Sequence, residues 1–262
     1  MPPLSLSPAL ARIAVQHWHV TSGKKLHTIR EEGNQVFAID YRSDGTRFAT
    51  AGRDFKVRLY DEATKKCVTT LSGADRDGGS HGHANRVFSL KFFPDDENIL
   101  MSAGWDNTVQ LWDLRMDDAV RSIFGPHICG DAVDVGGNTV VTGSWRPENQ
   151  LQLWDFTSGA LIETIPWAPG LDGEPCFLYC AQFSRDHELI AAGGSGSNEA
   201  KIFDRASNRA IGTVSGMTKG VYTLDFSPDS KMIAVAGGDS NVRILDIQKI
   251  ETAADAAASS AN

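Results

Sequence analysis

A repeat with a period of 42 residues is the feature that most constrains how this chain can fold. Short apolar runs recur along the sequence, most of them ending in an aromatic residue followed by Asp. Taking that aromatic residue or its equivalent as a marker gives Trp18, Tyr60, Trp112, Trp154, Phe203 and Leu245. Successive markers lie 42, 52, 42, 49 and 42 residues apart, so two of the intervals carry insertions of 10 and 7 residues. Such a period is typical of an array of similar supersecondary units.

Each period predicts four short strands. The first strand has an alternating apolar pattern, at Val36–Tyr41, Val87–Phe92, Tyr179–Phe183 and Val221–Phe226. A second strand of small residues and the third, marker-bearing strand follow, separated by turns rich in Gly, Pro, Asp and Ser, which favour chain reversal. The fourth strands are predicted at Leu26–Ile29, Val68–Leu71, Leu161–Ile165 and Ala210–Val214. Four strands in about 40–45 residues indicate one blade of an all-β propeller.

Composition narrows the class of protein further. The 262 residues include 25 Lys and Arg against 33 Asp and Glu, a formal net charge of −8, and 41% are hydrophobic, enough for a core. The acidic balance argues against a non-specific nucleic-acid or anionic-membrane binder. No apolar run approaches the ~20 residues of a transmembrane helix. The N-terminus lacks the residue order of a signal peptide. Four cysteines make no disulfide framework, so we expect a soluble protein of the cytoplasm or nucleus.

One repeat carries a recognisable motif: Gly82-His83, then Ser102, Asp106 and Trp112-Asp113. With the repetition, this motif resembles the WD-repeat family over roughly residues 12–247. The resemblance implies that His83, Ser102, Asp106 and Trp112 form a structural hydrogen-bond chain within one blade, and satisfied buried polar groups would fix the strand arrangement. Other repeats depart from the pattern: the first has Thr50, Asp54 and Tyr60 without Gly-His, and the third has no clear Asp.

The strand count leaves the completeness of the ring open. The sequence predicts five full repeats plus an N-terminal partial blade, with the fifth repeat ending after its third strand at Ile247. In the family an N-terminal strand commonly closes the ring, which here places Lys24–Ile29 beside Val242–Ile247 and leaves Arg12–Val20 over. A closed five-bladed ring, an open arc and an incomplete larger propeller all remain possible. We expect a propeller domain at 12–250, with tails at 1–11 and 251–262, the latter disordered.

Candidate partner-binding residues lie in the turns between second and third strands. These turns and the fourth-to-first connections, which carry both insertions (72–84 and 166–175), are expected to share one face. The turns offer Arg53, Trp105, Trp145 and Arg146, and Trp and Arg are enriched at interface hot spots. An exposed patch of this kind suits a peptide with an acidic or aromatic anchor; alternatively, each Trp packs on its neighbouring loop. The preferred function is a non-enzymatic scaffold that binds a protein or peptide.

Two rival functions use other residues. The run from Ile99 to Arg115 is similar to the box by which some WD-repeat proteins dock a cullin-ligase adaptor; there Arg115 would make the contact, or it is simply a solvated strand-end Arg. Alternatively, a polar ring near the axis would serve a propeller enzyme; its residues are Asp40, Lys91, Asp134, Gln182 and Asp225. Cys176 and Cys180 have no second pair or nearby His, so we expect no metal, cofactor or catalytic residue. An open ring would predict self-association.

Overall fold

The computed structural model describes residues 14–72, 82–116, 118–169 and 173–247, and its regular elements are all β-strands. The N-terminal hairpin consists of β1 (Val15–His19) and β2 (Lys24–Ile29). Blade 1 contains β3 (Val36–Tyr41), β4 (Arg47–Gly52), β5 (Val57–Asp61) and β6 (Cys67–Leu71). Blade 2 contains β7 (Val87–Phe92), β8 (Ile99–Gly104), β9 (Thr108–Asp113) and β10 (Asp118–Phe124). No helix in the described ranges has the length and apolarity needed to cross a membrane.

The remaining sheets follow the same order. Blade 3 contains β11 (Val133–Gly136), β12 (Thr139–Gly143), β13 (Leu151–Asp155) and β14 (Leu161–Ile165). Blade 4 contains β15 (Cys176–Phe183), β16 (Leu189–Gly196), β17 (Ala200–Asp204) and β18 (Arg209–Val214). Blade 5 contains β19 (Val221–Phe226), β20 (Met232–Gly237) and β21 (Val242–Asp246). Every sheet is an antiparallel meander, in which each strand pairs with its sequence neighbours.

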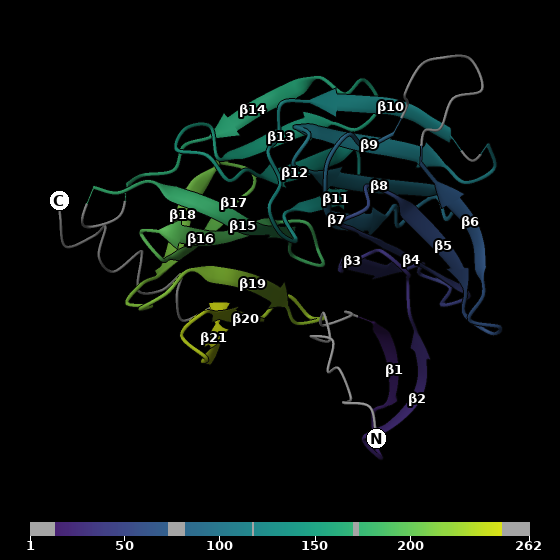
Figure 1. Cartoon of the computed structure of the whole chain (residues 1–262). Coiled ribbons are helices and arrows are strands. Elements are labelled where there is room, and N and C mark those ends of the chain that lie inside the picture. Colours follow the sequence, from purple (N-terminus) through teal and green to yellow (C-terminus); the bar gives the residue numbers. More distant parts are fainter. Residues whose placement is uncertain (1–13, 73–81, 117, 170–172, 248–262) are drawn as a thin grey trace, which may run out of the picture.

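The five blades are arranged around a common centre, with their first strands innermost (Figure 1). Neighbouring first strands pack on one another in chain order, from β3 through β7, β11 and β15 to β19. The β1–β2 hairpin lies at one end of this series of blades, next to blade 1, and blade 5 lies at the other end (Figure 1). The predicted all-β propeller is therefore confirmed, together with most of the predicted strand positions.

Two details of the predicted topology are wrong. The strand β2 pairs with β1, in a register that joins Val15 to Ile29, and not with β21. The closing strand pair expected between Lys24–Ile29 and Val242–Ile247 is therefore not formed. The stretch expected to be left over instead supplies the partner of β2, because the two strands are neighbours in the chain and a hairpin needs no long-range closure. The expected tails at 1–11 and 251–262 lie outside the described residues.

Small residues in the second strands allow the blades to approach one another. Gly193 of β16 lies so close to the next blade that a Cβ atom there would be 2.7 Å from Val221 Cγ1. A Cβ at Gly143 of β12 would lie 3.0 Å from the Ala181 Cβ of blade 4. Larger side chains at these positions would overpack the interface between sheets. The small-residue pattern of the second strand is therefore a requirement of blade-to-blade packing.

Candidate functional site

The turns of the blades lie on two opposite faces. Each turn between a second and a third strand hydrogen-bonds to the segment before the first strand of its blade, as in Arg53 N to Gln35 O (3.0 Å) and Trp105 N to Arg86 O (3.0 Å). These turns, at 53–56, 105–107, 144–150, 197–199 and 238–241, define the top face. The turns at the other ends of the strands define the bottom face. Second-to-third turns and entries to the first strands therefore share one face, as predicted.

An aromatic contact crosses each of the four blade boundaries at or near the top face. We call the set the aromatic row; its members are Phe37, Phe88, Trp105, His127, Trp145, Phe177, Tyr179 and Tyr222. Phe37 stacks on Phe88 with ring centroids 4.8 Å apart, and Trp145 packs on Phe177 at 4.9 Å. The contacts fix the relative positions of adjacent blades, because offset-stacked and edge-to-face ring pairs are favourable beyond their buried area.

Most of this row was not singled out from the sequence. Phe37, Phe88, Phe177 and Tyr222 each occupy the second position of the first strand in their blade. By register, Phe37, Phe88 and Tyr222 lie at the bulge of their first strand, and the equivalent residue of blade 4 is Tyr179; an aromatic residue at this repeated position is the signal that identifies them. Since first strands start at the top face, this position places one aromatic ring per blade near the candidate site in four of the five blades.

The two predicted tryptophans differ in exposure. Trp145 is 39% exposed and packs against Phe177 of the next blade; its role in partner binding stays a prediction. Trp105 is partly buried: its indole Nε1 donates to Cys129 Sγ (2.9 Å), and the guanidinium of Arg86 lies over its ring at 4.9 Å from the centroid. Arg86 was not predicted as a site residue. Packing therefore holds Trp105 in place, whereas Trp145 keeps free apolar surface.

The two predicted top-face arginines also differ. Arg53 is exposed in its turn. The guanidinium of Arg146 donates to the carbonyl oxygens of Gly125 (3.2 Å) and Asn149 (3.0 Å) and to the side chain of Gln152. Burial lowers the pKa of Arg146 from its ordinary value. Arg146 therefore holds a turn of blade 3 together, and Arg53 is the better placed of the two for a partner.

Arg115 is not brought together with the other candidates. It lies on the bottom face, in the turn after β9, and its guanidinium forms two hydrogen bonds with Asp113 (2.8 and 2.6 Å). The Arg115 side chain nevertheless remains 59% exposed. Its role as an adaptor contact stays a prediction.

The structural network expected in blade 2 is present. His83 Nδ1 lies 2.7 Å from Asp106 Oδ2 and His83 Nε2 lies 2.6 Å from Ser102 Oγ, while Trp112 Nε1 donates to the same Ser102 hydroxyl (2.7 Å). Burial alone would raise the pKa of Asp106. The hydrogen bond and charge of His83 outweigh this effect, so the pKa of Asp106 lies below its ordinary value. The chain ties the top-face turn to the second and third strands of the blade.

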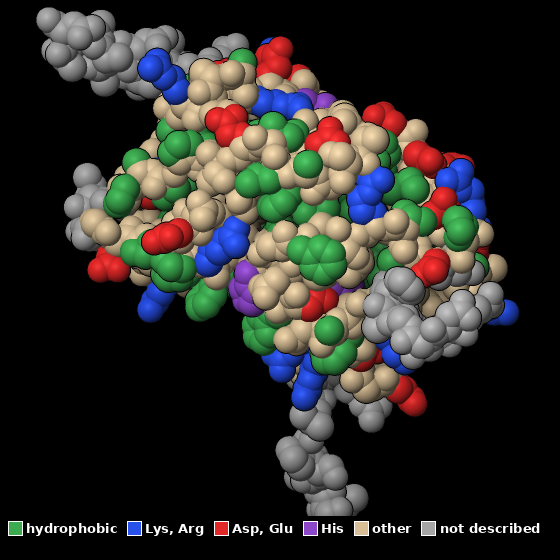
Figure 2. Space-filling view, turned by 90° about the horizontal axis from the view of Figure 1, so that it is seen from above, with side chains coloured by type: hydrophobic (Ala, Val, Ile, Leu, Met, Phe, Trp, Pro, Cys, Tyr) green, Lys and Arg blue, Asp and Glu red, His purple; other side chains and the backbone are tan. Residues whose placement is uncertain are grey.

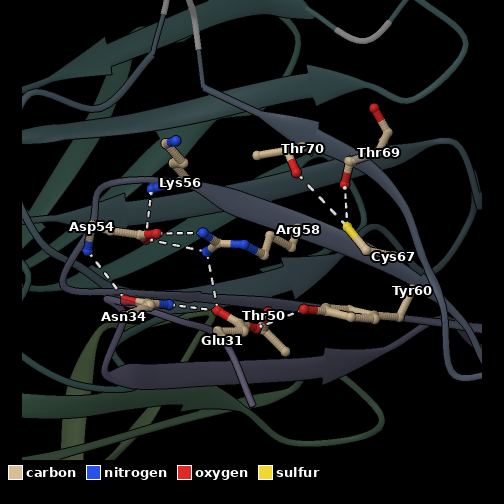
Figure 3. Close-up of polar contacts among 10 residues, drawn as sticks. All are labelled: Glu31, Asn34, Thr50, Asp54, Lys56, Arg58, Tyr60, Cys67, Thr69 and Thr70. Atoms are coloured by element: carbon tan, nitrogen blue, oxygen red, sulfur yellow. Dashed lines mark hydrogen bonds and ion pairs between the residues drawn. The ribbon is translucent and has the colours of Figure 1, made fainter. Parts of the chain in front are cut away.

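Blade 1 builds an equivalent network without a histidine (Figure 3). Glu31 takes the place of the imidazole: Tyr60 Oη donates to Glu31 Oε1 (3.0 Å), and the Thr50 hydroxyl donates to the same oxygen. Arg58 bridges Glu31 (3.0 Å) to Asp54. The Glu31 side chain is only 2% exposed, so it depends on this guanidinium for compensation. Because blade 1 lacks the Gly-His pair, the motif does not predict Glu31 as a member of the network.

Blades 3 and 4 use reduced networks. In blade 3, Trp154 Nε1 donates to Thr142 Oγ1 (2.9 Å), but His127 turns away to Asn107 of blade 2. In blade 4, a buried ion pair of Glu199 and Lys201 (3.1 Å) occupies the corresponding region. These blades keep the strand order while losing the motif.

The predicted axial polar ring lines one cavity of about 280 Å³. Its lining includes Asp40, Lys91, Asp131, Asp134, Gln182 and Asp225. Asp40 accepts a hydrogen bond from Phe92 N of the next blade (2.7 Å), and Asp134 accepts one from Phe183 N (2.9 Å). Lys91 pairs with Asp134 across blades 2 and 3 (3.0 Å). Asp40, Lys91 and Asp134 therefore connect neighbouring blades and stabilise their packing.

The side chains that could bind a metal ion are spread over the part of the chain that the structure describes. Within the described ranges, no three His, Cys, Asp or Glu side chains are grouped closely enough to hold a metal ion. Burial raises the pKa of the Cys176 thiol to about 11, which favours the protonated form over the thiolate that binds metals. On the side that carries β10 and β14, acidic, basic and hydrophobic side chains are interspersed (Figure 2). That side shows no continuous basic field of the kind that binds nucleic acid.

Comparison with known proteins matches three segments of the chain to the family model "WD domain, G-beta repeat", at residues 23–61, 65–113 and 208–246. The stretch between the second and third segments, 114–207, holds blade 3 and the first three strands of blade 4, the two blades whose networks are reduced. The chain is 26% identical to "Protein tipD" of Dictyostelium discoideum over 84% of its own length and 33% of that relative's. It is 24% identical to "Cell division cycle 20.4, cofactor of APC complex" of Arabidopsis thaliana, over 88% and 60% of the two lengths.

A third relative is "Pre-mRNA-processing factor 19" of Oryza sativa subsp. japonica, 24% identical over 93% of this chain and 44% of the relative. The chain thus spans between a third and three-fifths of the length of these relatives. The repeat period, the four-stranded blades, the His83 network and the matched family model agree, and the chain contains repeats of the WD-repeat family.

Proposed function

We propose that the chain is a non-enzymatic scaffold whose top face binds a peptide or partner protein. WD repeats and the relatives support a protein-interaction role at the level of the family. The observation that carries the choice of face is the aromatic row, in which Trp145 keeps 39% of its surface exposed. A rigid, partly exposed aromatic surface is typical of interaction hot spots.

The charges beside the row indicate the kind of ligand. Arg53 is exposed, and Arg86 lies over the Trp105 ring. Guanidinium groups beside aromatic rings favour a peptide that combines an aromatic or apolar anchor with carboxylates. We therefore propose an acidic peptide segment as the ligand of the top face. An intracellular site of action is part of the same proposal.

A peptide-display selection on the immobilised chain tests this function. We expect selected peptides to share acidic and aromatic residues, and Trp145→Ala to weaken their binding about tenfold, because truncating a hot-spot Trp removes well over 1 kcal/mol. Arg53→Ala should weaken binding and reduce its dependence on salt. The matched control is Arg115→Ala on the bottom face. Selected peptides that bind Trp145→Ala as well as the wild type would contradict the proposed face.

A further inference from the structure

The outer face of blade 5 differs from the same face of every other blade. In blades 1 to 4, the first and third residues of the run that ends in the marker and Asp are at most 5% exposed; these pairs are Val57 and Leu59, Val109 and Leu111, Leu151 and Leu153, and Ala200 and Ile202. Their equivalents in blade 5 are Val242 and Ile244, which are 68% and 70% exposed. The same apolar positions are thus buried in four blades and open to solvent in the fifth.

Two neighbouring strands bury these positions in the other blades. A fourth strand pairs along the edge and places an apolar residue opposite the first position, as Val214 does opposite Ala200. The first strand of the next blade then covers the face, as Val221 does over Gly193. Among the described residues, blade 5 has neither neighbour.

The uncovered surface is continuous. In the register of β20 and β21, Ala236 lies opposite Val242 and Ala234 lies opposite Ile244, so the four side chains share one face. Ala234 and Ala236 are small, like Gly193, which is the equivalent of Ala236 in blade 4, and small residues there leave room for the first strand of a following blade. An edge strand with unpaired backbone groups is in addition a template for strand addition.

We propose that this surface binds a two-strand β-segment of a partner protein. Its first strand pairs antiparallel with β21 and places an apolar residue opposite Val242; its second strand crosses over Ala234 and Ala236. The chain contains a template for such a ligand in residues 209–226, where β18 and β19 perform both tasks for blade 4. Pairing of β21 with its equivalent in a second copy of the chain would supply the edge strand but would leave the face over Ala234 and Ala236 uncovered.

A synthetic peptide of residues 209–226, labelled with a fluorophore, tests the proposal by anisotropy titration with the full chain. We expect saturable one-to-one binding that a peptide of scrambled order does not show. Hydrogen exchange at the amides of β21 should slow when the peptide is bound.

Matched variants locate the binding. Ile244→Glu changes a side chain that is 70% exposed, and should weaken peptide binding at least about tenfold by placing a charge in the contact. Ile162→Glu makes the same change at a 53% exposed position of β14 and should leave binding unchanged. Trp145→Ala should also leave it unchanged, which separates this surface from the proposed top-face function.

Three results would overturn the proposal. The first is binding of the 209–226 peptide no tighter than that of the scrambled peptide. The second is equal binding by the wild type and Ile244→Glu. The third is a dimer in sedimentation velocity that Ile244→Glu abolishes, because a second copy of the chain would then be the occupant.

Discussion

Ionisation of Asp40 opposes folding at neutral pH. Its carboxyl group lies in the axial cavity, and burial raises its pKa from 3.8 to about 6, although Phe92 N donates to it and Lys91 lies nearby. The difference of about 2 pKa units corresponds to about 3 kcal/mol, at 1.36 kcal/mol per unit. We therefore expect Asp40→Asn, which keeps an acceptor for Phe92 N, to raise the free energy of unfolding at pH 7 by up to about 3 kcal/mol.

The effect has a defined pH window. Because the pKa of Asp40 is higher in the folded protein, the folded state binds more protons than the unfolded state between pH 4 and 6. The stability linked to this proton is fully present below pH 4 and is lost as the pH rises through 6. The advantage of Asp40→Asn should thus be roughly halved at pH 5 and small at pH 4.

Urea unfolding followed by circular dichroism at pH 4, 5, 6 and 7 measures the difference between the variant and the wild type. Asp95→Asn, at an exposed carboxylate in the turn after β7, is the control. A difference between Asp40→Asn and the wild type that does not change from pH 4 to 7 would refute the reasoning. So would an Asp40→Asn variant that is less stable than the wild type at pH 7.

Three further substitutions test the blade networks and packing, each by the midpoint of urea unfolding. Arg58→Met leaves the Glu31 carboxylate buried without its cation and should cost about 3 kcal/mol, more than an exposed Arg such as Arg115. Gly193→Val forces a side chain against Val221 and should cost about 1–3 kcal/mol; an unchanged midpoint would contradict the packing argument. His83→Ala leaves buried partners unsatisfied and should cost about 2 kcal/mol or more, and equal stability would show that the network is dispensable.

The sequence predicted the propeller because its information is local and repeated. Strands such as Val36–Tyr41 and Val87–Phe92 were predicted at their observed bounds, since alternation and turn residues are read within one period. The pairing of β2 was predicted incorrectly, because the choice between two edge partners depends on the positions of the chain ends in space. That choice has no signature within a single period.

The site was predicted in outline only. The Trp residues in the top-face turns were identified by residue type, but two of the partners of Arg146 are backbone carbonyl groups, which carry no sequence signal. Glu31 was missed because a carboxylate with a distant Arg replaces a histidine, and the pair becomes visible only when residues 27 positions apart meet. Residue type thus predicted which turns carry candidate binding side chains. The three-dimensional contacts decide which of these side chains already have partners within the chain.

The ionic network of blade 1 has a consequence for the order in which such a blade can evolve. A glutamate that arises at position 31 before the arginine would be a buried charge without compensation, which selection for stability would remove. An arginine that arises first is tolerated, because it pairs with the aspartate four residues before it. Blade 5 has that simpler arrangement, in which Arg243 Nη1 lies 2.8 Å from Asp239 Oδ2. The Arg–Asp pair can therefore exist without the glutamate, whereas the buried glutamate requires the arginine.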